Sequence, residues 1–193
     1  MDKGTVLDVV AFSTAEALEQ WIAQNHAKSN GIWVRFYKKG SGVPSVSYDE
    51  ALDLALCFGW IDGQLKKCDE ASWLRKFSPR RPKSVWSKRN REHAERLIRA
   101  GQMQPTGLEE IEAAKQDGRW NAAYDSASQM VIPDDFLKEL AKNEQAEAFF
   151  KTLNRANLYA ITWRLQTAKK PETRQKRLQA ILAMLANGQK FHG

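Results

Sequence analysis

Residues 31–37 read Gly31-Ile32-Trp33-Val34-Arg35-Phe36-Tyr37, and this stretch decides the fold class. Ile, Val and Phe alternate with Trp, Arg and Tyr, which predicts a strand with large rings on both faces. Capping-box sequences lie on both sides of it, at Ser13-Thr14-Ala15-Glu16 and at Ser47-Tyr48-Asp49-Glu50. They predict an amphipathic helix that runs to about His26 and a second, central helix that Gly59 ends.

Two further strands are predicted at residues 60–66 and 71–77, joined by a turn at residues 67–70. The second strand is expected to stop before residues 78–84, because that segment contains two prolines. A strand, a helix and a hairpin in this order predict a small mixed β-sheet packed with helices.

An amphipathic helix is predicted next, beginning at Ser84 or Ser87 and ending at Gly101. Residues 105–117 predict another helix, and residues 118–131 show no regular pattern. The inward side of the first of these helices is expected to carry Trp86, His93, Ala94, Leu97 and Ile98. We interpret His93 as a hydrogen-bonded packing residue.

From residue 132 onward the sequence predicts helices only, each with its own apolar stripe. The residues expected to start or cap these helices are Pro133, Asn143, Asn154 and Pro171. The fold class is therefore α+β, with an α+β N-terminal region at residues 1–131 and a C-terminal helical module of about four short helices at residues 132–193.

The composition is that of a globular protein, with 42% hydrophobic and 27% charged residues in a chain of 193. No run approaches the roughly 18 uncharged apolar residues that span a bilayer, and the first residues lack an export signal, so we expect a cytoplasmic protein. Cys57 and Cys68 are too few for a disulfide framework, and we interpret them as reduced thiols.

The formal charge of +7 is concentrated in two blocks. Residues 75–99 carry ten basic and two acidic side chains, and residues 164–193 carry seven and one. Such blocks are typical either of solvated faces or of sites for anionic partners.

Several catalytic motifs are absent from the sequence. No glycine cluster has the spacing of a Walker phosphate loop or of a dinucleotide fingerprint. The three histidines lie far apart without carboxylates at ligand spacing, and neither cysteine has a neighbouring base. Catalytic residues therefore stay unknown, and neither a metal nor a cofactor is expected.

Asp62 lies between two glycines and beside an indole, in Gly59-Trp60-Ile61-Asp62-Gly63. A carboxylate held there could bind a ligand or act as a base, but a structural role in the turn is the favoured interpretation. The proline-stiffened segment 77–90 places Arg80 and Arg81 before a helix N-terminus, which suits an anion. Asp62 is also an obvious internal partner for Arg80.

The candidate ligand-binding residues share polar or aromatic side chains near these two motifs: Tyr48, Asp49, Trp60, Asp62, Arg80, Arg81, Trp86 and Lys88. A second basic surface is predicted on the last helix, at Lys169, Lys170, Arg174 and Arg177. The expected partner is an anionic small molecule or an acidic protein surface, while nucleic acid is less favoured and the oligomeric state is open.

The motifs, in this order, resemble those of the YdeI/OmpD-associated family, also called bacteriocin-protection proteins. The residues that carry the resemblance are Tyr48-Asp49-Glu50-Ala51, Leu56–Gly63, Phe77–Arg81 with Trp86-Ser87-Lys88, Gly118-Arg119-Trp120 with Ala123-Tyr124, and, near the C-terminus, Tyr159, Trp163, Ala168-Lys169, Glu172-Thr173-Arg174, Arg177 and Gly188. The resemblance leads us to expect an apolar residue at position 164, where this chain has Arg164.

The resemblance implies a part in antimicrobial or envelope-stress tolerance, but it implies no reaction and no ligand. The sequence thus predicts a soluble protein that binds an anionic ligand or partner at a basic surface. One alternative is an enzyme with a small-molecule pocket around Asp62 and Arg80, and another is a nucleic-acid-binding protein. A third is a scaffold in which Leu158, Ile161 and Leu165 face a protein partner.

Overall fold

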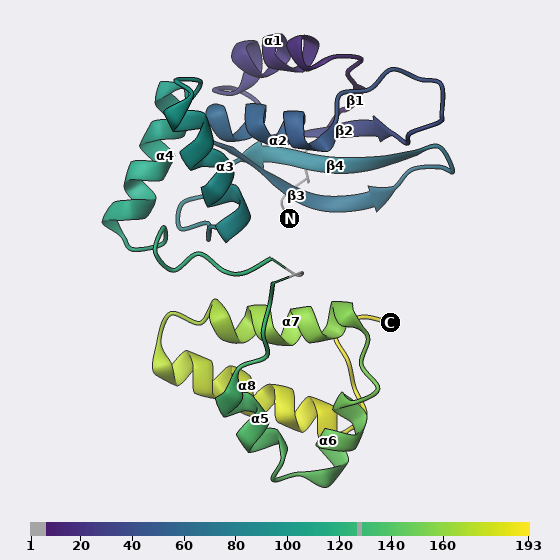
Figure 1. The fold of residues 1–193 in the computed structure, drawn as a ribbon, viewed down its shortest axis with the longest axis vertical. Coiled ribbons are helices and arrows are strands. Elements are labelled where there is room, and N and C mark those ends of the chain that lie inside the picture. The colour runs from purple at the N-terminus through teal and green to yellow at the C-terminus, as the bar shows by residue number, and fades with distance from the viewer. Residues whose placement is uncertain (1–6, 127–128) are drawn as a thin grey trace, which may run out of the picture. The chain divides into compact units, whose positions relative to one another are not determined.

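The computed structural model describes residues 7–126 and 129–193, which form two compact units. The N-terminal unit contains residues 7–84 and 90–121. The C-terminal unit contains residues 122–126 and 129–193 together with the short segment 85–89. Figure 1 shows the strands in the first unit and the last four helices in the second.

A mixed sheet of four strands is the centre of the N-terminal unit, as the sequence predicts. The strands are β1 (Val9–Ala11), β2 (Ile32–Tyr37), β3 (Trp60–Lys67) and β4 (Ser72–Pro79), in the order β1-β2-β4-β3. β1 is parallel to β2, and the other neighbours are antiparallel. β4 includes Pro79, although its end was predicted before the prolines, because Pro79 is the last residue of the strand, where a missing N–H is tolerated.

Two helices, α1 (Ala15–Asn25) and α2 (Tyr48–Cys57), pack on one face of this sheet. The core between them combines Leu18 and Ile22 of α1, Ala51 and Ala55 of α2, and the strand residues Ile32, Val34, Phe36 and Phe77. Ser47 and Glu50 form the predicted capping box, with both hydrogen bonds present. The cap of α1 is Thr14 rather than Ser13, since the Thr14 hydroxyl accepts from Ala17 N.

Helices α3 (Lys88–Arg99) and α4 (Pro105–Gln116) follow the sheet in the sequence. Gly59 ends α2 at φ +74°, as expected. At Gly107 the backbone of α4 approaches α2 so closely that an added Cβ would lie 2.3 Å from the carbonyl oxygen of Cys57. Ile98 of α3 was predicted to face inward but is 38% exposed, whereas Asn90 is buried.

The C-terminal unit consists of the four predicted helices, α5 (Asp134–Leu140), α6 (Glu144–Phe150), α7 (Arg155–Gln166) and α8 (Pro171–Ala186). Asn143 and Asn154 cap α6 and α7, each accepting a backbone N–H. The core joins Phe136, Leu140, Ile161, Leu165, Leu178, Ile181 and Leu185. Ile161 and Leu165 are buried here, so they do not face a protein partner. None of the described helices is long and apolar enough to cross a membrane.

Candidate functional site

Asp62 lies on β3 within a group of polar side chains, Tyr48, Asp62, Arg75 and Asn90, which we call the Asp62 cluster. The Tyr48 hydroxyl donates to Asp62 Oδ2 at 2.7 Å, and Arg75 Nη2 lies 3.0 Å from the same oxygen. Asn90 Nδ2 donates to Oδ1 at 3.4 Å. Both oxygens of Asp62 therefore have partners inside the chain, which favours a structural role.

Arg75 is the residue of this cluster that sequence reasoning missed. Its guanidinium donates to Gly63 O at 3.1 Å and lies 5.0 Å from the ring centroid of Tyr48. Burial and the neighbouring Asp62 raise the pKa of Tyr48, so its hydroxyl stays a donor. The strand period could have located Arg75, because it lies two residues before the buried Phe77 on the same face.

The other candidates from the N-terminal unit do not share one environment. Trp60 is a core residue whose indole N–H donates to His26 O at 3.2 Å. Arg80 is 6% exposed, and its backbone N–H donates to Gly59 O. Asp49 and Arg81 are exposed, Asp49 in the first turn of α2 and Arg81 after β4.

Trp86 and Lys88 belong to the C-terminal unit. Trp86 is 1% exposed, and Lys88 Nζ lies 2.5 Å from Asp125 Oδ1. Backbone hydrogen bonds join this segment to Tyr124, which accepts from Lys88 N and donates to Trp86 O. Trp86 and Lys88 therefore join segment 85–89 to Tyr124 and Asp125 of the C-terminal unit.

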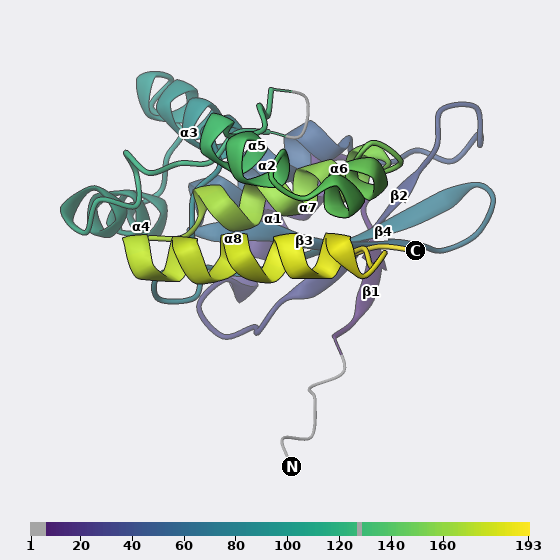
Figure 2. The same ribbon diagram turned by 90° about the horizontal axis from the view of Figure 1, so that it is seen from below.

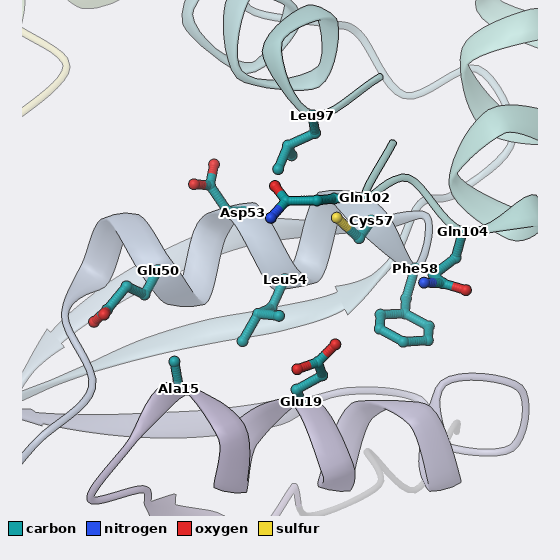
Figure 3. Close-up of a pocket in the computed structure, with 10 residues that line it drawn as sticks. All are labelled: Ala15, Glu19, Glu50, Asp53, Leu54, Cys57, Phe58, Leu97, Gln102 and Gln104. Atoms are coloured by element: carbon teal, nitrogen blue, oxygen red, sulfur yellow. The ribbon is translucent and has the colours of Figure 1, made fainter. Parts of the chain in front are cut away.

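A cavity of about 310 Å³ in the N-terminal unit is lined by residues of α1, α2 and α3 and of the segment between α3 and α4 (Figure 3). Its lining residues are Ala15, Glu19, Glu50, Asp53, Leu54, Cys57, Phe58, Leu97, Gln102 and Gln104, none of them a predicted site residue. Three of the ten are carboxylates, so the cavity does not fit the anionic ligand that the sequence suggested.

Asp53 in this cavity contacts two residues of α3. Its carboxylate lies 2.7 Å from His93 Nδ1 and 2.5 Å from Arg96 Nη2. The hydrogen bonds that Arg96 donates to Asp53 raise the pKa of Arg96. The prediction that His93 is a hydrogen-bonded packing residue is thereby supported.

Burial raises the pKa of the Cys57 thiol to about 11, with a contribution from Asp53. The thiol is thus protonated near neutral pH, which is unsuited to nucleophilic attack. Within residues 7–126 and 129–193 no three side chains of His, Cys, Asp or Glu gather as metal ligands would.

A second cavity, of about 380 Å³, lies in the C-terminal unit beside α7 and α8, which run side by side (Figure 2). Trp163, Arg164, Arg177, Ala180, Ile181, Met184 and Phe191 line it. We call it the Arg164/Arg177 cavity. Its wall is apolar apart from the two guanidinium groups.

Both arginines of this cavity are held by groups without negative charge. Arg177 Nη1 donates to Arg164 O at 2.7 Å and to Thr167 Oγ1 at 3.2 Å. The Arg164 guanidinium lies 3.9 Å from the ring centroid of Phe191. Among the described residues, neither arginine has a carboxylate within ion-pairing distance.

The predicted second basic surface is therefore only partly available. Arg177 lines the cavity, but Arg174 forms two hydrogen bonds with Asp135, one of them 2.9 Å long. Lys169 and Lys170 are exposed between α7 and α8. The sequence identifies Arg164 only as an unexpected residue, and its place in the wall of the cavity was not predicted.

Comparison with protein families matches two segments of the chain. Residues 10–110 match a domain of unknown function (DUF8412). Residues 129–188 match the family described as "Bacteriocin-protection, YdeI or OmpD-Associated". Comparison with curated proteins and with solved structures gave no match.

Proposed function

Because this chain belongs to the YdeI/OmpD-associated, bacteriocin-protection family, with a DUF8412 domain before the family segment, we propose that its C-terminal unit binds a small organic anion with an apolar group. The binding site is the Arg164/Arg177 cavity. Six of its seven lining residues lie within the matched segment 129–188.

The observation that carries this proposal is the charge of the cavity. Arg164 and Arg177 both line it, and neither has a carboxylate partner among the described residues. A carboxylate or phosphate that accepts hydrogen bonds from a guanidinium gains about 1.5–3 kcal/mol for each such bond. An anion entering the cavity would supply the missing negative charge.

The apolar wall specifies the rest of the ligand. Trp163, Ile181, Met184 and Phe191 offer surface to a hydrocarbon chain or an aromatic ring. A concave site with an apolar wall and a few convergent polar groups is the usual form of a small-molecule pocket. For this reason we favour a small molecule over an acidic protein surface.

Arg164 stands where the family resemblance leads us to expect an apolar residue. The structure gives the arginine a defined place, over the ring of Phe191 and at the cavity wall. We propose that it adds the second positive group, which raises affinity for anions. The variant Arg164→Leu restores an apolar side chain and removes that group.

Calorimetric titration of the full chain tests the proposal with decanoate, naphthoate and decyl phosphate. Decylamine serves as the cationic match and inorganic phosphate as an anion without an apolar part. We expect binding of the amphipathic anions only, weakened at least tenfold in Arg164→Leu, which corresponds to about 1.4 kcal/mol. Lys176→Leu removes a neighbouring exposed charge on α8 and should bind like the wild type. Equal binding of decylamine, or wild-type affinity in Arg164→Leu, would contradict the proposal.

The family description leads us to extend the proposal to stress tolerance. Bacterial cells that express the wild-type chain should survive a bacteriocin or a cationic antimicrobial peptide better than cells without it. Cells that express Arg164→Leu at the same level should lose this advantage. If they keep it, the protection does not depend on the cavity.

A further inference from the structure

The sheet of the N-terminal unit has a second face, opposite to α1 and α2. On β2 the core side chains Ile32, Val34 and Phe36 alternate with Trp33, Arg35 and Tyr37. The register places Lys76 opposite Trp33, and Leu74 opposite both Arg35 and Lys66. We call the residues Trp33, Arg35, Tyr37, Lys66 and Lys76 the open sheet face.

None of these five side chains belongs to the buried core. Trp33, Arg35, Tyr37 and Lys76 are half-buried, and Lys66 is exposed. Among the described residues, the helices that share a core with the sheet are α1 and α2. Both pack on the face opposite to these five side chains. Two large aromatic rings are thus left partly exposed on this face.

Cations lie against both rings. Lys66 Nζ is 4.3 Å from the ring centroid of Trp33, and the Arg35 guanidinium is 4.9 Å from that of Tyr37. Arg35 is paired with Asp69 at 2.5 Å. Lys66 and Lys76 have no carboxylate partner among the described residues, so the face carries uncompensated positive charge.

Flat aromatic rings interleaved with unpaired basic groups are the surface on which unpaired bases stack while cations contact the phosphates. We propose that the open sheet face binds single-stranded nucleic acid. The positive charge of this face is complementary to the phosphates of a nucleic acid. The aromatic rings favour a nucleic acid over an acidic protein, because an acidic protein has no bases to stack on them. A duplex fits poorly, because its bases are already stacked on one another.

The spacing of the rings suits several consecutive nucleotides. Trp33 and Tyr37 are four residues apart on one strand, which corresponds to about 13 Å along it. Lys66 and Lys76 lie on the two strands that continue the sheet beyond β2. A bound nucleic-acid strand would therefore stack its bases on the rings of Trp33 and Tyr37, with its phosphates toward β4 and β3.

Fluorescence anisotropy of labelled oligo(dT) and oligo(U) of about twelve nucleotides tests the proposal on the full chain. With two phosphates contacted, by Lys66 and Lys76, affinity should fall about sevenfold between about 50 and about 200 mM salt. A duplex of the same length should bind at least tenfold more weakly. Undetectable single-strand binding at the lower salt, or equal binding of the duplex, would overturn the proposal.

Matched variants locate the surface. Lys66→Gln should weaken binding several-fold and reduce the salt dependence, whereas Lys67→Gln, the equally exposed neighbour on β3, should not, because its side chain alternates to the other side. Trp33→Leu, checked for folding by circular dichroism, should weaken binding without changing the salt dependence. Equal losses of affinity in Lys66→Gln and Lys67→Gln would show that the nucleic acid binds elsewhere. Unchanged affinity in Trp33→Leu would show that bases do not stack on this ring.

Discussion

The hydroxyl of Tyr48 is the shortest contact of Asp62, at 2.7 Å, and it also accepts from Arg75 Nη2 at 3.2 Å. Removing it leaves a half-buried carboxylate with one donor fewer. We therefore expect Tyr48→Phe to lower the free energy of unfolding by about 1–3 kcal/mol in urea titrations. Tyr37→Phe is the control, because Tyr37 lies on the open sheet face and its hydroxyl has no hydrogen-bond partner among the described residues. Equal midpoints for the two variants would show that the Asp62 cluster adds no stability.

The two cysteines differ in burial, and their reactivity should differ accordingly. Cys57 is 5% exposed with a pKa raised to about 11, whereas Cys68 is exposed. A thiol reagent at about pH 8 should modify Cys68 quickly and Cys57 only after unfolding, since the thiolate is the reactive form. Mass spectrometry of the native protein should show one modification, and none in Cys68→Ser. Rapid modification of Cys57 would contradict its assigned environment.

At the scale of the element, the contact between α2 and α4 depends on the missing side chain of Gly107. A methyl group there would meet the carbonyl oxygens of Cys57 and Leu56 at 2.3 and 2.8 Å, so the helices must separate. We expect Gly107→Ala to destabilise the N-terminal unit by about 1–3 kcal/mol, although alanine favours helix. Thermal unfolding of Gly63→Ala gives the comparison, because its added Cβ would have no neighbour closer than 3.6 Å. A Gly107→Ala protein as stable as the wild type would show that the two helices do not pack this closely.

Most elements could be predicted because their signals are local. Ser47, Asn143 and Asn154 accept the N–H bonds that their positions before apolar patterns indicate. β1 was missed because three residues are too few to show alternation, and the strand exists through its parallel pairing with β2. Local sequence patterns are sufficient to predict such helices, whereas a short strand such as β1 depends on a pairing partner that is distant in the sequence.

The candidate sites were harder to predict for the same reason. Asp53 and His93 are 40 residues apart in the sequence, and no spacing rule joins them. Arg75 carries the same charge as Arg80, so choosing the arginine that reaches Asp62 needs the strand period together with the pairing of β3 and β4, which places Phe77 opposite Asp62. The Arg164/Arg177 cavity depends on Phe191, which lies beyond the last helix.

At the scale of the whole molecule, the ion pair between Lys88 and Asp125 fastens segment 85–89 to the C-terminal unit. Hydrogen bonds from Lys88 and Gln166 lower the pKa of Asp125. A carboxyl whose pKa is lower in the folded state stabilises above its unfolded pKa of about 3.9, and this stabilisation is lost as the pH falls through the folded value. Thermal unfolding of the C-terminal unit should therefore shift to lower temperature in acid below about pH 4.

Asp125→Asn should flatten that acid dependence and lower stability at neutral pH. Lys88→Gln should have the same effect, and the double variant should be no worse than either single one, because all three lack the same pair. Additive losses in the double variant would mean that the two residues act separately.

Segment 85–89 belongs to the C-terminal unit, yet it lies within residues 10–110, the part of the chain that matches the DUF8412 domain. The chain thus enters the C-terminal unit, leaves it, and returns after residue 121. We expect that the two matched segments were not exchanged separately in evolution, since a recombinant that received residues 129–188 alone would lack Trp86 and the Lys88–Asp125 pair. Their ancestry in this lineage is therefore expected to be shared, with substitutions around Trp86 and Tyr124 changing together.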